Sequence, residues 1–331
     1  MLDQSAGSTA IAVVGDVYLS RSYPQTAFDR VREAFDAADC VLGNLESTLT
    51  THERDKFIYP WASLDSSPAM APGLEFFDVL SLANNHGMDC GRGGLLETID
   101  VVSEHGVEVI GAGADEAAAA RPAVFSDRGS TIGVLAYEAT HWSWGKMQAG
   151  PDKAGMNVVP VSPFYADPKV SEFGMERYRD TIERVADDVD VLLVMLHSGI
   201  AADRTIAVHQ RALAEGAVDA GADAVLGSHP HILQPVDVYR GAPIVYSFSN
   251  FVFDSPTLDF PRETVLAHLE VTDGALDGMD LYPVYINDSG QPEFPSPGSD
   301  AYERTADDLV SLSEREGTTL EREESHLRVP I

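Results

Sequence analysis

Short runs of apolar residues alternate with amphipathic stretches along most of the chain, and this alternation limits the possible folds more than any other feature. The apolar runs have the length of buried strands, and the stretches between them have the length and spacing of helices. Strands are expected at 11–14, 40–42, 79–82, 107–110, 131–136, 191–196 and 224–226, and helices at 27–38, 93–105, 173–187 and 205–220. Regular alternation of this kind predicts a layered α/β fold.

The last third of the chain departs from this alternation. Strands expected at 236–239, 244–248, 264–271 and 276–285 follow one another without a helix, which predicts an antiparallel part of the fold. From residue 287 the chain is rich in Pro, Gly and Ser and then strongly acidic, with an exposed helix expected at 301–315. We therefore expect one domain over 1–286 and an acidic C-terminal tail over 287–331, partly helical or disordered.

Residues 140–170 are rich in Pro, Gly, Trp and Asp and predict a long functional loop. His141, Trp142 and Trp144 lie in it, either as the floor of a substrate pocket or as packing anchors.

The charge balance argues against two classes of partner. The chain has 53 Asp and Glu residues against 22 Lys and Arg, which gives a net charge of −31. A surface this acidic repels nucleic-acid backbones and anionic lipids, so we expect neither as a partner. The acidic residues are spread along the chain, which favours adaptation to a high-salt cytoplasm where ions screen the repulsion. An acidic face that repels particular substrates is the alternative.

Neither a secretion signal nor a membrane anchor is predicted. The first nine residues are polar and carry no basic segment, and no apolar run reaches the roughly 18 residues that span a membrane. We therefore expect a cytoplasmic protein without membrane insertion. Cys40 and Cys90 form no CxxC motif, so two buried thiols are expected, with one disulfide bridge as the alternative.

Residues that can bind a metal ion follow directly on five of the expected strands. They are Asp16, the pair Asn44 and Glu46, the run 84–86, His197, and the pair His229 and His231. In open α/β sheets, ligands bind at the carboxyl ends of the strands. Mixed oxygen and imidazole ligands suit Mn, Fe or Zn, as one ion or as two. Each residue also has an ordinary structural role open to it, such as a helix cap for Asp16 or a buried hydrogen-bonded imidazole for His197.

These segments also resemble a known family. The motifs GDVYL at 15–19, GNLE at 43–46, LANNH at 82–86, GSHPHI at 227–232 and YSFSNFVFD at 246–254 are similar, in this order, to the CapA/PgsA proteins of poly-γ-glutamate capsule biosynthesis. That family belongs to the calcineurin-like metallophosphoesterase superfamily, and the resemblance covers about residues 10 to 285. It implies a four-layer αββα sandwich over 1–286. It also implies metal ligands at Asp16, Glu46, Asn85, His197, His229 and His231, and a general acid at His86.

Four positions differ from the usual superfamily pattern. Tyr18 stands where the first motif has His, and Asn44 stands where the second has Asp. Ser198 begins a stretch where relatives have Trp-Gly-x-Glu, and Ser249 replaces a Gly. The missing histidine leaves open whether one or two metal ions bind.

The resemblance implies a hydrolase in which a metal-activated water attacks a phosphoester or amide while His86 protonates the leaving group. The expected partner is a poly-γ-glutamate-type anionic polymer or a phosphorylated small molecule. The alternative is a non-catalytic protein that binds or assembles such a polymer. The sequence leaves the oligomeric state open.

Overall fold

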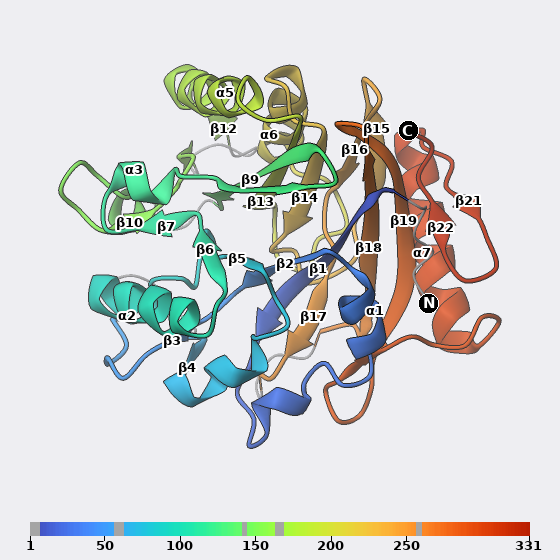
Figure 1. Ribbon diagram of the computed structural model, residues 1–331, viewed down its shortest axis with the longest axis horizontal. Helices are drawn as coiled ribbons and strands as arrows, with labels where there is room; N and C mark the ends of the chain where they lie inside the picture. Colours follow the sequence, from blue (N-terminus) through green and yellow to red (C-terminus); the bar gives the residue numbers. More distant parts are fainter. Residues whose placement is uncertain (1–6, 56–62, 141–143, 163–168, 256–259) are drawn as a thin grey trace.

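Two large β-sheets form the centre of the protein (Figure 1). The computed structural model describes residues 7–55, 63–140, 144–162, 169–255 and 260–331. The first sheet has the order β21-β22-β19-β18-β1-β2-β5-β6, with β17 beside β1 and β20 beside β19. The second has the order β15-β16-β14-β13-β9-β8.

The strands of the first sheet are β1 (Thr9–Tyr18), β2 (Cys40–Leu45), β5 (Val79–Ser81), β6 (Glu108–Ile110), β17 (Asn250–Phe253), β18 (Glu263–Thr272), β19 (Ala275–Ile286), β20 (Pro292–Glu293), β21 (Glu321–Arg322) and β22 (Leu327–Arg328). Those of the second are β8 (Ala123–Asp127), β9 (Ser130–Ala139), β13 (Val191–Ser198), β14 (Ala224–Ser228), β15 (Val236–Tyr239) and β16 (Ala242–Val245). Strands β1, β2, β5 and β6 run parallel, as do β9, β13, β14 and β16.

The helices are α1 (Arg32–Ala37), α2 (Gly91–Glu104), α3 (Glu116–Ala119), α4 (Trp144–Met147), α5 (Glu172–Ala186), α6 (Val208–Asp219) and α7 (Asp300–Glu316), with 3-10 turns η1 (Pro24–Thr26) and η2 (Pro68–Gly73). Three short strand pairs complete the described elements: β3 (Thr48–Leu49) with β4 (Asp65–Ser66), β7 (Ala112–Gly113) with β10 (Gly155–Met156), and β11 (Val161–Ser162) with β12 (Lys169–Val170).

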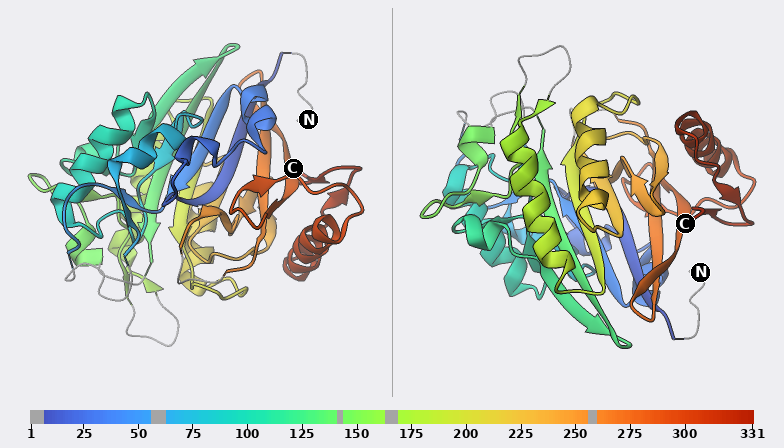
Figure 2. Two further views of the ribbon diagram at one scale, coloured as in Figure 1. Left: turned by 90° about the horizontal axis from the view of Figure 1, so that it is seen from below. Right: turned by 90° about the horizontal axis from the view of Figure 1, so that it is seen from above.

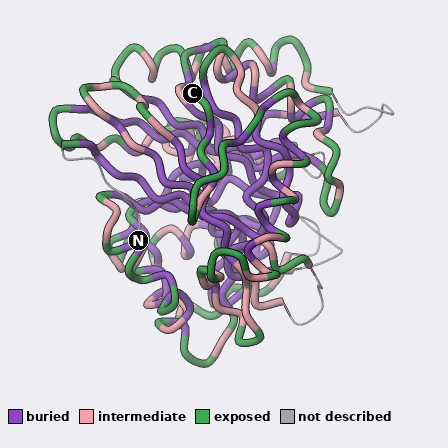
Figure 3. Tube along the Cα trace, turned by 90° about the vertical axis from the view of Figure 1, so that its right-hand side faces the viewer, coloured by how far each residue is buried: buried purple, intermediate pink, exposed green. Residues whose placement is uncertain are grey.

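Alternating residues of the strands explain how the sheets pack, because successive side chains point to opposite faces. Val13 of β1 and Leu193 of β13 belong to one buried cluster that lies between the two sheets. The opposite face of β1 packs with α1 and α2, and the opposite face of β13 packs with α5 and α6. Figure 2 shows these helices outside the sheets, and Figure 3 shows buried chain running through the interior. The predicted mixed α/β fold is confirmed.

Helix α5 forms where its sequence pattern predicts a helix. Ser171 caps the helix, since its Oγ accepts a hydrogen bond from the Gly174 backbone N–H at 3.0 Å. Gly174, Tyr178 and Ile182 are its buried residues, and their spacing of four places them on one face of the helix.

The C-terminal segment contains the expected helix as α7, but it is packed against the fold, so the expectation that this helix is exposed is wrong. Helix α7 begins at the Ser299 cap and ends at Gly317, whose φ of +94° is a left-handed C-cap. Tyr302, Ala306 and Leu309 join the cluster between the sheets, and β22 pairs with β19. The acidic composition suggested disorder because it hid a three-to-four residue spacing of apolar side chains. The division of the chain at residue 286 stays a prediction.

Several element boundaries also differ from expectation. The helix predicted at 27–38 is only α1, preceded by the turn η1 at Pro24. The strand predicted at 244–248 is shorter, because β16 ends at Val245 and Phe248 forms only an isolated bridge to Leu233. The 140–170 region contains α4, β10, β11 and β12 in its described parts. His141 and Trp142 lie outside the described residues.

Cys40 and Cys90 are buried free thiols, as expected. Among the described residues, the structure contains no helix that is both long and apolar enough to cross a membrane.

Candidate metal centre

The predicted metal-binding residues lie together where parallel strands of the two sheets end. Asp16 comes from β1 and Glu46 follows the last residue of β2. His197 lies near the end of β13, and His229 and His231 follow β14. Each of these five residues is less than 6% exposed. Asp16 lies within β1 rather than after it, because β1 extends to Tyr18 as it changes partner from β18 to β17.

The side chains form two groups that could each hold a metal ion. One consists of Glu46, His197 and His229, and the other of Asp16, Glu46 and His231. Within each group, all ligand atoms lie within 4.8 Å of one another. Glu46 belongs to both groups, and its Oε1 lies 3.6 Å from His197 Nε2 and 3.7 Å from His231 Nε2. A carboxylate shared in this way can bridge two ions.

Glu46 is fully buried, and its one hydrogen-bonding neighbour among the described residues is another buried acid, Asp16. Burial raises its pKa well above the ordinary value, and the neighbouring Asp16 carboxylate raises it further. Burial also raises the pKa of Asp16 to about 6. Two neighbouring buried carboxylates are costly, and a bound cation relieves that cost. The residues therefore fit a divalent metal ion.

The histidines have the protonation state that a metal requires. Burial lowers the pKa of His197 well below the ordinary value and lowers that of His231 to about 4. Both imidazoles are therefore neutral at pH 7, which is the form that coordinates metal ions.

Hydrogen bonds orient the two imidazoles. His231 Nδ1 lies 2.9 Å from Asn250 Oδ1, so this nitrogen donates and Nε2 faces Glu46. His197 Nδ1 lies 2.8 Å from Ser228 Oγ, while its Nε2 lies 2.6 Å from Asn85 Oδ1. Such partners fix the ring orientation of metal-binding histidines. Sequence reasoning gave no role to Ser228 or Asn250, although both lie within the quoted motifs.

Asn44, which replaces the usual Asp, holds a carboxylate in place. Its Nδ2 donates to Asp16 Oδ1 at 2.7 Å and lies 3.2 Å from His197 Nδ1. Asn84 Nδ2 in turn lies 3.2 Å from Asn44 Oδ1. An uncharged amide therefore links the two groups of ligands.

His86 lies next to Asn85 but outside the ligand groups found among the described residues. Its Nδ1 lies 2.7 Å from Asp89 Oδ2, and both side chains are buried. The same Asp89 oxygen accepts a hydrogen bond from the Leu64 backbone N–H at 2.7 Å. Asp89 was not among the predicted site residues, although its spacing of three residues from His86 is a usable signal.

The motif glycines are required by close backbone contacts. A Cβ on Gly15 would lie 2.0 Å from the Ser249 carbonyl oxygen, and one on Gly227 would lie 2.1 Å from that of Tyr246. His229 and His231 have φ of +98° and +58°, which is strained for residues with a side chain. Ser249, where Gly is usual, has φ of +69° and donates a hydrogen bond to the His231 carbonyl at 3.2 Å.

Tyr18 stands where the first motif usually has a metal-binding histidine, and it supplies an aromatic ring instead. Its ring centroid lies 5.5 Å from that of Phe253. Phe253 lies 5.1 Å from the His231 ring, and Phe260 stacks on the same imidazole at 4.5 Å. The first-motif position therefore supplies packing beside His231.

Glu138 is a further buried carboxylate at the end of a strand. It pairs in register with His197 on the neighbouring parallel strand, so both side chains point to the same face. One oxygen accepts hydrogen bonds from the Thr140 backbone N–H and hydroxyl, and the other has no partner among the described residues. Burial raises the pKa of Glu138 to about 8. Glu138 was not among the predicted site residues, because the strand was expected to end at residue 136 whereas β9 continues to Ala139.

The structure thus brings five of the six predicted ligands into two groups and places Asn85 against His197. Their coordination of a metal and the acid role of His86 stay predictions.

Known proteins resemble this chain over most of its length. The family described as Bacterial capsule synthesis protein PGA_cap matches residues 10–255. The PGA biosynthesis protein CapA of Bacillus subtilis (strain 168) is 29% identical over 83% of this chain and 71% of its own length. The capsule biosynthesis protein CapA of Bacillus anthracis is 27% identical, covering 86% of this chain and 68% of its own length. A probable polyglutamine synthesis accessory protein of Mycobacterium tuberculosis (strain CDC 1551 / Oshkosh) is 30% identical, covering 76% and 67% respectively. The chain therefore belongs to the CapA family of bacterial capsule synthesis proteins.

Proposed function

We propose that this protein is a metal-dependent hydrolase of the CapA family that processes a poly-γ-glutamate-type polymer or a phosphorylated precursor of one. The observation that carries the proposal is Glu46, a fully buried carboxyl group beside the buried Asp16 carboxyl group and grouped with three histidines. Such an arrangement is costly in a purely structural core. The facing sheets with helices on their outer sides support a four-layer metallophosphoesterase sandwich.

The residues of the site have the following proposed roles. Asp16, Glu46, His197, His229 and His231 would hold one or two ions of Mn, Fe or Zn, with Asn85 offering its amide oxygen. A divalent ion at this site supplies a polarised substrate oxygen and a lowered pKa of water. His86 donates a proton to the leaving group, and Asp89 holds its Nδ1 so that Nε2 is presented.

A non-catalytic role is the second candidate, and one observation favours it. Tyr18 packs against Phe253 in place of a ligand, which removes one nitrogen from the usual set. The mycobacterial relative is also named as an accessory protein. In this case the same fold would bind or assemble an anionic polymer.

The test is a substrate panel on metal-loaded protein. The panel contains nitrophenyl phosphate, bis-nitrophenyl phosphate, a γ-glutamyl nitroanilide and poly-γ-glutamate. His229→Ala should abolish turnover, while His105→Ala, at an exposed ion pair with Glu75, should leave it unchanged. A wild type that turns over none of the four would contradict the hydrolase, and saturable binding of the polymer would then support the second candidate.

A further inference from the structure

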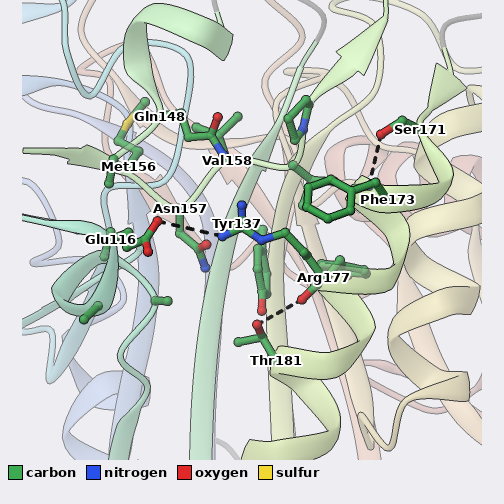
Figure 4. Close-up of a pocket in the computed structure, with 18 of the residues that line it drawn as sticks. Glu116, Tyr137, Gln148, Met156, Asn157, Val158, Ser171, Phe173, Arg177 and Thr181 are labelled. Carbon is green, nitrogen blue, oxygen red and sulfur yellow. Dashed lines mark hydrogen bonds and ion pairs between the residues drawn. The ribbon is translucent and has the colours of Figure 1, made fainter. Parts of the chain in front are cut away.

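A pocket lies on the side of β9 that faces away from the metal centre (Figure 4). Its walls come from α3, from α5 and from the segment 156–160, and its volume is about 360 Å³. That volume is within the range of small-molecule sites. Tyr137 lines this pocket, whereas its neighbour Glu138 points to the opposite face beside His197. Among the described residues, the pocket shares no lining residue with the two groups of metal-binding side chains.

Two opposite charges face each other across this pocket. Glu116 of α3 and Arg177 of α5 both line it, and the carboxylate of one lies 3.9 Å from the guanidinium of the other (Figure 4). This distance is too long for a hydrogen bond. Both side chains are about half exposed, so a dissolved ligand can reach them. An exposed ion pair of this kind contributes little to stability, and a ligand can replace it at small cost.

The charges of α5 are divided between its faces. Four acidic residues of this helix do not line the pocket: Glu172, Glu176, Asp180 and Glu183. The charged residues that α5 does supply to the pocket are Arg177 and Arg184. Glu116, on the opposite wall, is the acidic residue that lines the pocket among those described. One wall is therefore suited to an anion and the other to a cation.

The surface beside these two charges is apolar. Phe173 is 67% exposed, and the centre of its ring lies 5.9 Å from the guanidinium carbon of Arg177. Ala117 is exposed and Pro160 is partly exposed, and both line the same pocket. An apolar group of a ligand that covers this surface removes it from water, which favours binding.

We propose that this pocket binds an apolar α-amino acid. The carboxylate of the ligand pairs with Arg177, whose planar guanidinium matches it in geometry, and the ammonium group pairs with Glu116. The ligand's side chain covers Phe173. An α-amino acid fits better than a simple anion, because an anion beside Arg177 would also meet the Glu116 carboxylate. The proposal does not depend on the metal centre or on its activity.

Calorimetric titration with L-leucine tests the proposal, and three analogues serve as ligand controls. Isocaproate lacks the ammonium group of leucine, isoamylamine lacks its carboxylate, and glycine lacks its side chain. The wild type should bind leucine with a Kd near or below about 1 mM. Each analogue should bind at least about tenfold more weakly, because it loses one of the three contacts.

Variants of the two charged residues identify the contacts. Arg177→Gln and Glu116→Gln should each weaken leucine binding by about tenfold, and neither should lower the melting temperature, since both side chains are about half exposed. Glu116→Gln should not weaken the binding of isocaproate, which has no ammonium group. Arg179→Gln is the matched control, because Arg179 lies on the same helix outside the pocket and pairs with Asp219.

A further variant distinguishes binding in this pocket from binding at the metal centre, because amino acids can also coordinate metal ions. His229→Ala should bind leucine as the wild type does. The proposal is overturned if leucine does not bind, if isocaproate and isoamylamine bind as tightly as leucine, or if Arg177→Gln or Glu116→Gln binds leucine equally well. Loss of leucine binding in His229→Ala would also overturn it, since the ligand would then lie at the metal centre.

Discussion

The buried carboxylate of Glu138 predicts a stability that falls as pH rises. Burial raises its pKa from 4.5 to about 8, so the folded protein holds this proton while the unfolded chain releases it. The stabilisation is therefore fully present below about pH 4.5 and is lost as pH rises through 8. A shift of roughly 3.5 units corresponds to about 5 kcal/mol at 1.36 kcal/mol per unit. Glu138→Gln keeps the shape and the acceptor for Thr140 but removes the charge.

The assay is chemical denaturation of metal-free protein at pH 5 and pH 8 in constant high salt. Glu138→Gln should match the wild type at pH 5 and exceed it by several kcal/mol at pH 8. Glu33→Gln, on the exposed side of α1, should behave as the wild type at both values. The pKa of Asp16, raised to about 6, also makes the folding stability fall as pH rises. This contribution is the same in the wild type and in Glu138→Gln. Equal stability of wild type and Glu138→Gln at pH 8 would show that the folded protein does not hold a proton on Glu138.

Three further predictions follow from the site and the surface. His86→Ala should lower turnover by about 10²–10⁴-fold, with a smaller loss on nitrophenol esters, whose leaving group needs no proton. Metal content measured by mass spectrometry should be unchanged. Equal turnover of variant and wild type on every substrate would mean that His86 is structural. The melting temperature should rise between about 0.1 M and 1 M KCl, because the Debye length falls from about 10 Å to about 3 Å around a chain of net charge −31; a flat or falling curve contradicts the halophilic interpretation. Gly227→Ala should lower the stability measured by denaturation by several kcal/mol, since its Cβ would meet the Tyr246 carbonyl at 2.1 Å. Gly278→Ala is the comparison without a clash, since nothing lies within 4 Å of its Cβ and its φ is not positive.

The sequence predicted which segments form strands better than it predicted where those strands end. Apolar runs such as 191–196 identify a strand because burial on both faces needs continuous apolar residues. The same rule fails at the ends, where β9 and β13 continue through Glu138 and His197 and carry polar groups into the site. Helix α7 was recognised as a helix, but its packing against β19 depends on contacts distant in sequence.

The metal-binding residues were predicted from their residue types. The hydrogen bonds that orient them were not predicted. Asp16, Glu46 and the histidines share the strand-end position, which a sequence pattern can show. The hydrogen bonds of Ser228 to His197 and of Asn250 to His231 join different strands, so no local spacing could predict them. The pocket at Tyr137 likewise appears only when α5 is packed on β9.

Metal binding accounts for the burial of Glu46 beside Asp16 and three histidines. Metal content and melting temperature should be measured together for wild type, Glu46→Gln and the control Glu33→Gln, before and after loading with Mn or Zn. At a metal concentration of about 100 times Kd, binding adds about 2.7 kcal/mol, which is about 4 °C for a chain of 331 residues. The wild type and Glu33→Gln should show this rise with at least one ion per chain, whereas Glu46→Gln should lose it and be no less stable without metal. Fewer than about 0.2 ions per chain in loaded wild type, with no change in melting temperature, would contradict the account.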